Sequence, residues 1–239
     1  MEIKIYQQLN DIEKITGTAV IIDVFRAFTV ESYLLAGGIR NLYAVGDASL
    51  AYAYREGHPD ALLIGERHGK IMDGFDYGNS PSQIAAASFA GRDAVHTTSA
   101  GTQGIAGAIN ATEILAAGLV NAAATARYIL RSGASDVALV CMGLEAVKPT
   151  QEDTLCARYI KALLKNPAKA APGADASDLI DWPAEIDILK QTSGAKFFDR
   201  TLSDIFPEED FHRSVEVDRF DFAIKAADFN AGLYRMKML

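Results

Sequence analysis

Cysteine is scarce in this chain, with only Cys141 and Cys156 among 239 residues. One ends a strand-like run and the other falls in a helix-like run, so a disulfide framework is excluded and buried free thiols are expected. Long apolar runs are also missing, and none approaches the roughly 20 residues of a membrane-spanning helix. The N-terminal stretch MEIKIYQQLNDIEKI carries charges of both signs and no continuous apolar segment. This pattern excludes an export signal and predicts a cytoplasmic protein with no membrane partner.

Clusters of positive charge are absent as well. The chain has 23 Lys and Arg against 31 Asp and Glu, which gives a formal net charge of -8. Because phosphate backbones are bound by clustered Lys and Arg side chains, this balance excludes nucleic acid as a partner. A small anion can still be bound locally. The hydrophobic fraction of 49% is that of an ordinary globular protein with a substantial core.

The sequence does contain an alternation of short apolar runs with longer Ala-rich segments. This alternation is typical of strand–helix units, and runs that are apolar throughout are typical of strands covered by helices on both faces. We therefore expect a three-layer α/β/α fold with a largely parallel or mixed sheet. The expected strands are 18–24, 41–45, 61–65, 93–97 and 136–143, and the expected helices are 27–38, 47–57, 80–89, 101–110, 120–133 and 150–165.

The last third of the chain differs in composition. Residues 166–182 contain Ala, Pro, Gly and Asp without periodicity, which predicts a surface loop. Residues 183–239 are richer in aromatic and charged side chains, and we expect them to form a smaller C-terminal part of a single α/β domain spanning 1–239. Partial alternation over 211–229 predicts one or two closing strands, antiparallel to their neighbours and at an edge of the sheet.

Polar residues follow several expected strands at the point where each strand ends, which is where open α/β sheets bind ligands. After the first strand, Asp23 can ligate Mg²⁺ or cap the next helix, and Arg26 can bind a phosphate or pair with that Asp. Glu66 and Arg67 open the stretch GERHGKIMDGFDYGNS, whose glycines permit close approach to a ligand. A solvated loop is the alternative, but the stretch ends in residues that can cap a helix whose N–H groups face an anion.

Two further strand ends carry polar side chains. The segment HTTSAGTQG at 96–104 has hydroxyls and glycines that can cradle a phosphate or a sulfonate, although helix capping explains a single turn of this kind equally well. Glu152 and Asp153 follow the last expected strand in the first turn of a helix, where acids complement the helix dipole. Four such strand ends together favour a shared site with carboxylates for a hard cation, two arginines and converging amides.

Several catalytic motifs are missing. No Cys is followed six positions later by Arg, and Phe25 stands where a second Asp would complete the paired-Asp nucleophile motif. The spacing from Gly65 to Lys70 does not fit a P-loop, and neither HExxH nor GxSxG occurs. We expect His68 to lie at the surface rather than to act in catalysis.

Four motifs, VIIDVFRAFT, GERHGKIMDGFDYGNSP, HTTSAGTQG and EDTLCA, together resemble those of the 2-phosphosulfolactate phosphatases, from Asp23 to Arg158. The resemblance implies a Mg²⁺-dependent phosphoric monoester hydrolase associated with coenzyme M biosynthesis. Its substrate would be a small anionic phosphorylated hydroxy acid, 2-phosphosulfolactate or a similar molecule, and its products 3-sulfolactate and phosphate. Here TTSAGT stands for the familiar TTNGT and GERHG for GERGG. The altered turn favours, as a third possibility, another reaction on a related phosphorylated acid.

The strand ends and the resemblance together give the candidate site. We expect one carboxylate to position a water or to act as the nucleophile. The alternative is a non-catalytic protein that binds or senses an anion in the same pocket, and the size of the chain is compatible with a homodimer. The expected catalytic residues are Asp23, Arg26, Glu66, Arg67 and Asp153, with Asp23, Glu66 and Asp153 also binding Mg²⁺, and the expected substrate-binding residues are Asp76, Asn79, Ser80, Thr97, Thr98, Ser99 and Thr102.

Overall fold

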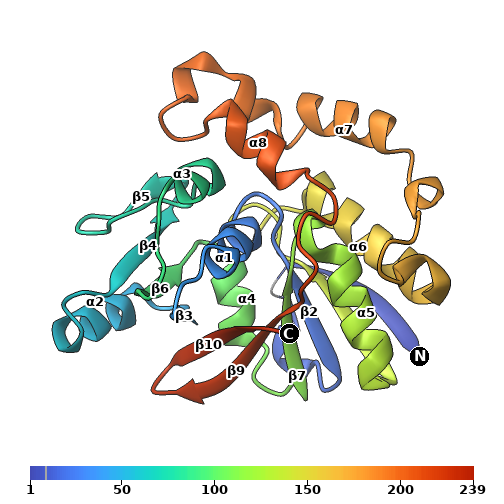
Figure 1. The fold of residues 1–239 in the computed structure, drawn as a ribbon, viewed down its shortest axis with the longest axis horizontal. Coiled ribbons are helices and arrows are strands. Elements are labelled where there is room, and N and C mark those ends of the chain that lie inside the picture. The colour runs from blue at the N-terminus through green and yellow to red at the C-terminus, as the bar shows by residue number, and fades with distance from the viewer. Residues whose placement is uncertain (9) are drawn as a thin grey trace.

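The computed structural model describes residues 1–8 and 10–239, and it shows a mixed α/β structure built on one large sheet (Figure 1). The strands are β1 (Glu2–Gln7), β2 (Thr18–Ile22), β3 (Asn41–Ala44), β4 (Leu62–Arg67), β5 (Lys70–Ile71), β6 (Asp93–Thr97), β7 (Glu113–Ala117), β8 (Asp136–Cys141), β9 (Ile224–Asn230) and β10 (Leu233–Met238). Their order in the sheet is β1-β8-β2-β7-β9-β10-β3-β6-β4-β5. Neighbours run parallel within β1-β8-β2-β7 and within β3-β6-β4. The prediction of a largely parallel or mixed sheet is therefore confirmed.

Helices cover both faces of this sheet. Consecutive residues of a strand point to opposite faces, and in β2 Ile21 packs into one hydrophobic cluster while Val20 and Ile22 pack into another. The predicted three-layer arrangement follows, because a strand buried on both faces has no polar side. The α-helices are α1 (Ala27–Ala36), α2 (Ala48–Gly57), α3 (Pro81–Ala86), α4 (Gly101–Gly107), α5 (Ala122–Ser132), α6 (Gln151–Lys165), α7 (Trp182–Gln191) and α8 (Glu208–Ser214), and the 3-10 helices are η1 (Ile12–Lys14), η2 (Leu119–Asn121), η3 (Pro167–Ala170), η4 (Ser177–Leu179), η5 (Ala195–Phe198) and η6 (Arg200–Leu202).

Helix ends follow the capping residues of the sequence. Ser80 accepts a hydrogen bond from the backbone N–H of Gln83 and so caps α3, which begins at Pro81. At the other end of a helix, α5 stops at Ser132 because Gly133 takes up a left-handed conformation with φ of 71°. Both boundaries agree with the sequence-based expectation.

The C-terminal strands form an antiparallel hairpin, as predicted, but its predicted position at an edge of the sheet is wrong. β9 pairs with β7 and β10 pairs with β3, so the hairpin lies inside the sheet and joins its two parallel parts. Each parallel part ends in a strand whose backbone N–H and C=O groups need partners, and the hairpin supplies them to both. The segment 211–214, which we expected to begin a strand, belongs to α8.

The two-residue strand β5 and two longer strands were not predicted. β1 has a mixed polar and apolar sequence at the edge of the sheet, and β7 is the short run EILAA, which is the next element after α4. Within 166–182, which was expected to be a loop, the chain forms the short 3-10 helices η3 and η4. Both cysteines are buried and free, as expected.

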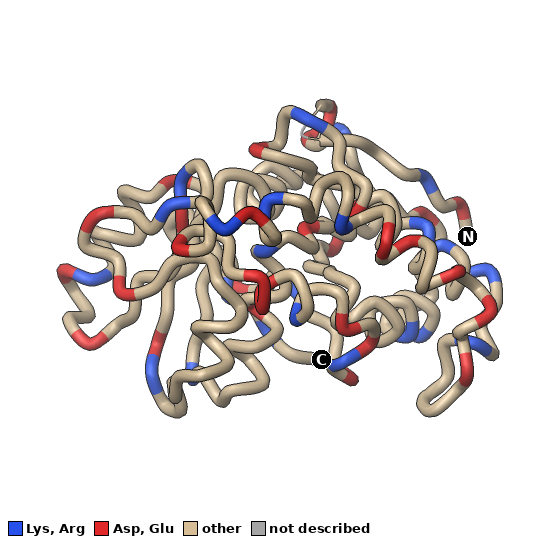
Figure 2. The backbone as a smooth tube through the Cα atoms, turned by 90° about the horizontal axis from the view of Figure 1, so that it is seen from above, with Lys and Arg blue, Asp and Glu red and all other residues tan. Residues whose placement is uncertain are grey.

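The segment from α7 to α8 lies over one side of the molecule (Figure 1). It brings side chains to the carboxyl ends of the strands, where the site lies. Lys and Arg positions are interspersed with Asp and Glu positions along the backbone (Figure 2). No helix in the described ranges has the length and apolar character needed to cross a lipid bilayer.

Candidate active site

A pocket of about 270 Å³ lies at the carboxyl ends of β2, β4, β6 and β8, and we call it the carboxylate pocket. Segments far apart in the sequence form its walls, and they include all four motifs. Two side chains from the segment between α7 and α8, Lys196 and Phe206, also line it. Six residues expected in the site line the pocket, namely Asp23, Arg26, Glu66, Asn79, Ser99 and Asp153.

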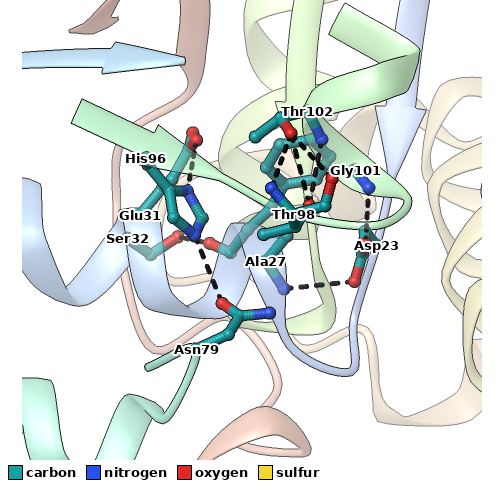
Figure 3. A network of polar contacts seen from close by, with 10 residues as sticks. Asp23, Ala27, Glu31, Ser32, Asn79, His96, Thr98, Gly101 and Thr102 are labelled. Atoms are coloured by element: carbon teal, nitrogen blue, oxygen red, sulfur yellow. Dashed lines mark hydrogen bonds and ion pairs between the residues drawn. The ribbon is translucent and has the colours of Figure 1, made fainter. Parts of the chain in front are cut away.

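Asp23 joins the starts of two helices at the end of β2. Its Oδ1 accepts a hydrogen bond from the N–H of Ala27 at 3.1 Å, and its Oδ2 accepts one from Gly101 at 2.8 Å (Figure 3). A side chain at Gly101 would place a Cβ 2.9 Å from Oδ2, so this close approach requires glycine. Burial raises the pKa of Asp23 to about 6, a rise that the N–H of Ala27 opposes and the nearby Glu66 carboxylate increases.

Glu66 is a buried carboxylate near the end of β4. Its Oε1 accepts a hydrogen bond from the backbone N–H of Ser99 at 2.7 Å, and its Oε2 accepts one from Gly69 at 2.6 Å. The hydroxyl of Ser99 also donates to Oε2 at 3.2 Å. Gly69 has a φ of 78°, which other residues adopt at a cost, so its position in GERHG serves this contact. The carboxylate is therefore held in one orientation facing the pocket.

Two neighbouring acids in the first turn of α6 complete the acidic wall. Asp153 accepts hydrogen bonds from the N–H of Val24 at 2.9 Å and of Gly143 at 2.8 Å, which joins the ends of β2 and β8. Burial raises its pKa well above the usual range, and Glu152 and Asp23 raise it further. Burial also raises the pKa of Glu152. The Oε2 of Glu152 is buried without a hydrogen-bond partner in the part of the chain that the structure describes.

The basic side chains of the pocket have different environments. Arg26 is buried, and its Nη1 donates to Oδ2 of Asp210 at 2.7 Å and to the carbonyl of Ile205 at 2.9 Å. Its guanidinium also lies 4.8 Å from the centre of the Phe206 ring. Lys196 forms no ion pair with the described residues. Burial lowers its pKa, against the attraction of Glu152.

Asn79 is oriented by a buried pair behind the pocket wall. Nδ1 of His96 lies 3.0 Å from Oε1 of Glu31, and its Nε2 lies 3.3 Å from Oδ1 of Asn79 (Figure 3). Because an amide oxygen can only accept, Nε2 of His96 must carry a proton in this contact. The amide nitrogen of Asn79 is then left to donate toward the pocket. Glu31 lies within α1, outside the strand ends where we expected functional residues.

The remaining expected residues lie outside the pocket lining, and each has a contact of its own. Arg67 donates to Thr97 Oγ1 at 2.9 Å and to the Gly46 carbonyl at 3.3 Å. Asp76 pairs with Arg55.

Three hydroxyls expected in the site serve helix starts instead. Thr102 Oγ1 accepts from the N–H of Thr98 at 2.8 Å and Thr98 Oγ1 accepts from the N–H of Thr102 at 3.2 Å, so the two close the turn before α4. Ser80 caps α3 and donates to Asp210 at 2.8 Å. Helix capping, the alternative considered for the turn at 96–104, accounts for the contacts of Thr98 and Thr102, and the cap formed by Ser80 is the one that the sequence predicted. His68 is exposed at the rim of the pocket beside Glu145, in agreement with the predicted surface position.

Sequence reasoning missed the residues from the C-terminal segment. Asp210 is one of three consecutive acids in the first turn of α8, where acids are ordinary, and nothing in its neighbourhood marks it as buried. Lys196 and Phe206 follow no strand, so the search for polar strand ends could not reach them. Glu152 was noted at a strand end, and its unpartnered oxygen became visible only in the structure.

The side chains of the carboxylate pocket have the chemistry that a hard cation needs. Burial raises the pKa values of Asp23, Glu152 and Asp153, because removal from water disfavours the charged form, and repulsion between carboxylates raises those of Asp23 and Asp153 further. Among the described residues, no three His, Cys, Asp or Glu side chains are grouped closely enough to hold an ion by themselves. An ion here would have one or two carboxylate ligands and water, the coordination that Mg²⁺ commonly has. The acids that line the pocket are Asp23, Glu66, Glu145, Glu152 and Asp153.

This chain is similar in sequence to several proteins that all have the same name. A family model described as 2-phosphosulpholactate phosphatase matches residues 3–228. A probable 2-phosphosulfolactate phosphatase of Bacillus subtilis (strain 168) is 30% identical over 227 residues, which cover 94% of this chain and 93% of that protein. A protein of the same name from Caldanaerobacter subterraneus subsp. tengcongensis is 30% identical over 92% of each chain, and one from Deinococcus radiodurans is 41% identical over 53% of each. The chain belongs to the 2-phosphosulpholactate phosphatase family.

Proposed function

We propose that this protein is a Mg²⁺-dependent phosphatase that hydrolyses 2-phosphosulfolactate, or a similar small phosphorylated hydroxy acid, to 3-sulfolactate and phosphate. The observation that carries the proposal is the wall of buried carboxylates, oriented by backbone N–H groups and facing Arg26 and Lys196 in one pocket. Membership of the family supports the choice of reaction. We also expect the protein to act in the cytoplasm.

Asp23, Glu66 and Asp153 are the candidate ligands of Mg²⁺, and the ion would bind one or two of them together with water. Each has both oxygens turned toward backbone donors. Oε2 of Glu66 also accepts from the Ser99 hydroxyl, whereas the other five oxygens accept one hydrogen bond each from described residues and keep a second lone pair for a ligand. Bound Mg²⁺ would neutralise phosphoryl oxygens and so favour attack on phosphorus. The ion would also relieve the repulsion among the acids that line the pocket.

The other polar residues would act on the phosphoryl group and on water. Arg26 can stabilise charge on the phosphoryl oxygens, since its guanidinium is held in place by Asp210. Asn79 can donate its amide N–H to the same group. The Oε2 of Glu152 is buried and has no hydrogen-bond partner among the described residues. Burial raises the pKa of Glu152, and this side chain would accept the proton of the attacking water. The sequence leaves open the choice between a base and a nucleophile, and we propose a base.

Phosphate release from 2-phosphosulfolactate tests this function directly. We expect turnover with Mg²⁺ that EDTA abolishes and added Mg²⁺ restores. Glu66→Gln should lower kcat/KM by about a hundredfold or more, because it removes a charged oxygen at the ion. The same substitution at the exposed Glu56 of α2 is a matched control and should change little.

Two results would contradict the proposal. The first is an absence of Mg²⁺-dependent turnover on 2-phosphosulfolactate and on a panel of related phosphorylated hydroxy acids. The second is tight binding of these acids without hydrolysis, which would indicate a protein that binds or senses the anion. Thermal stabilisation by the ligand without phosphate release would identify that case.

A further inference from the structure

A second pocket, of about 450 Å³, adjoins the carboxylate pocket, and we call it the lysine pocket. The two share three wall residues, Leu144, Thr150 and Lys196. The remaining wall of the lysine pocket comes from the start of α6 and from the turn after α7. Because Leu144, Thr150 and Lys196 line both, the two pockets lie side by side, and Lys196 can contact a ligand in either one.

The two pockets differ sharply in charge. The carboxylate pocket has five acidic lining residues, whereas the described residues that line the lysine pocket include two cations, Lys148 and Lys196, and no Asp or Glu. An anion in the lysine pocket therefore meets attraction without direct repulsion from its own walls. A second anionic group placed in the carboxylate pocket would be repelled by the acidic side chains there.

Lys196 and two hydroxyls are available to such an anion. Lys196 makes no ion pair with described residues, and its ammonium lies 5.0 Å from the Phe206 ring centre and 5.4 Å from that of Phe197. The two rings therefore lie beside the ammonium group, and a cation so placed can still donate hydrogen bonds to a ligand on its other sides. The hydroxyl oxygens of Thr150 and Ser193 are buried without a hydrogen-bond partner among described residues. They lie near Glu152, whose pKa they lower, and can equally donate to a ligand.

We propose that the lysine pocket binds the second acidic group of the substrate, a carboxylate or sulfonate, through Lys196, with the phosphoryl group held in the carboxylate pocket. The inference rests on the proposed function, because it takes from it that the phosphoryl group binds in the carboxylate pocket. It makes Lys196 a specificity-determining residue, because a phosphate monoester without a second acid cannot use it.

Steady-state kinetics on three substrates test the proposal, all with saturating Mg²⁺. The substrates are 2-phosphosulfolactate, 2-phospholactate, which lacks the sulfonate, and phenyl phosphate, which has no second acid. Lys196→Met keeps the length and apolar contacts of the side chain and removes its charge. We expect kcat/KM to fall about 10- to 100-fold, chiefly through KM, for a substrate whose acid contacts Lys196. For phenyl phosphate the loss should be clearly smaller than for the acid that contacts Lys196, because this substrate is affected only through the attraction between Lys196 and the Glu152 carboxylate.

The pattern of losses identifies the bound group. A loss on 2-phosphosulfolactate alone assigns the sulfonate to Lys196, and a loss on 2-phospholactate as well assigns the carboxylate. Lys196→Arg should restore much of the lost activity, and Lys190→Met, at an exposed lysine on α7 that pairs with Asp187, should behave as the wild type. Equal losses on all three substrates, or no loss on any, would overturn the proposal.

Calorimetry with 3-sulfolactate separates this inference from the proposed function, because no turnover is needed. We expect Lys196→Met to bind this acid about 10- to 100-fold more weakly than the wild type and Lys190→Met do. Should the wild type hydrolyse none of the substrates, this same difference would uphold the lysine pocket while the proposed function fails. Equal binding by all three proteins, or no binding by the wild type, would overturn the lysine pocket even if phosphatase activity is found.

Discussion

Most acidic side chains of the carboxylate pocket have a structural role beside their proposed chemical one, because they connect distant segments of backbone through hydrogen bonds. Asp23 connects the starts of α1 and α4, and Asp153 connects the ends of β2 and β8. Glu152 differs, since its Oε2 has no hydrogen-bond partner in the described chain. Chemistry and stability can therefore be separated at Glu152, whereas a change at Asp23 or Asp153 affects both.

Glu152→Gln should lower kcat by about 10²- to 10⁴-fold, the usual effect of losing a general base. The free energy of unfolding should stay constant or increase, because the change removes one of several buried like charges and relieves repulsion with Asp153. Kinetics and urea denaturation on one preparation would measure both quantities. A variant that keeps its kcat, or that loses more than about 2 kcal/mol of stability, would contradict the role given to Glu152.

At the scale of elements, one buried aspartate attaches α8 to two other helices. Oδ2 of Asp210 accepts from Arg26 at the start of α1, and its Oδ1 accepts from the hydroxyls of Ser80 and Ser82 at the start of α3. The backbone N–H of Ser82 donates to the same oxygen at 2.9 Å. This fully partnered carboxylate holds the C-terminal segment over the pocket and fixes the guanidinium of Arg26.

Asp210→Asn should lower the free energy of unfolding by about 3 kcal/mol, because it leaves the buried Arg26 charge without compensation. It should also raise KM, since the guanidinium loses its fixed orientation. Ser82→Ala is a milder change at the same junction and should cost about 1 kcal/mol. Chemical denaturation of the three proteins would measure the differences. Equal stability of Asp210→Asn and the wild type would show that the Asp210 carboxylate does not stabilise the fold.

At the scale of the whole molecule, the carboxylate pocket links stability to pH and to cations. The pKa values of Asp23, Glu152 and Asp153 are raised in the folded protein. An acid with a raised folded-state pKa destabilises the fold above that pKa, and the cost disappears as pH falls toward the unfolded-state pKa. For Asp23, whose pKa rises from 3.8 to about 6, the cost at neutral pH is on the order of 2–3 kcal/mol.

Without Mg²⁺ the protein should therefore become more stable as pH falls from 7.5 to about 5.5. Mg²⁺ should stabilise it at pH 7.5 and reduce this slope, because the bound ion compensates the same charges. Thermal unfolding with EDTA and with Mg²⁺ at each pH would measure the effect, and Asp23→Asn should show a smaller slope. Stability that decreases on acidification over this range, with EDTA present, would contradict the electrostatic account of the pocket.

The local pattern of apolar and capping residues was sufficient to predict much of the fold. β2, β4, β6 and β8 were predicted because continuous apolar runs mark strands buried on both faces, and α3 and α5 because Ser80 and Gly133 mark their ends. β1 and β7 escaped prediction, since the first is a mixed edge strand and the second is the short run EILAA. A cytoplasmic location and a homodimer stay predictions.

The sequence by itself determined which motifs would meet, because parallel strands present their carboxyl ends at one side of a sheet, and Asp23, Glu66 and Asp153 follow such strands. Only the tertiary structure decided which side chains face the pocket. Arg67 and Thr98 form hydrogen bonds outside the pocket lining, with Thr97 and Thr102 respectively. Lys196 lines the pocket although it lies more than a hundred residues after Glu66 in the sequence. Side-chain direction and long-range packing depend on neighbours that no local pattern contains, and these decided which charges the substrate would meet.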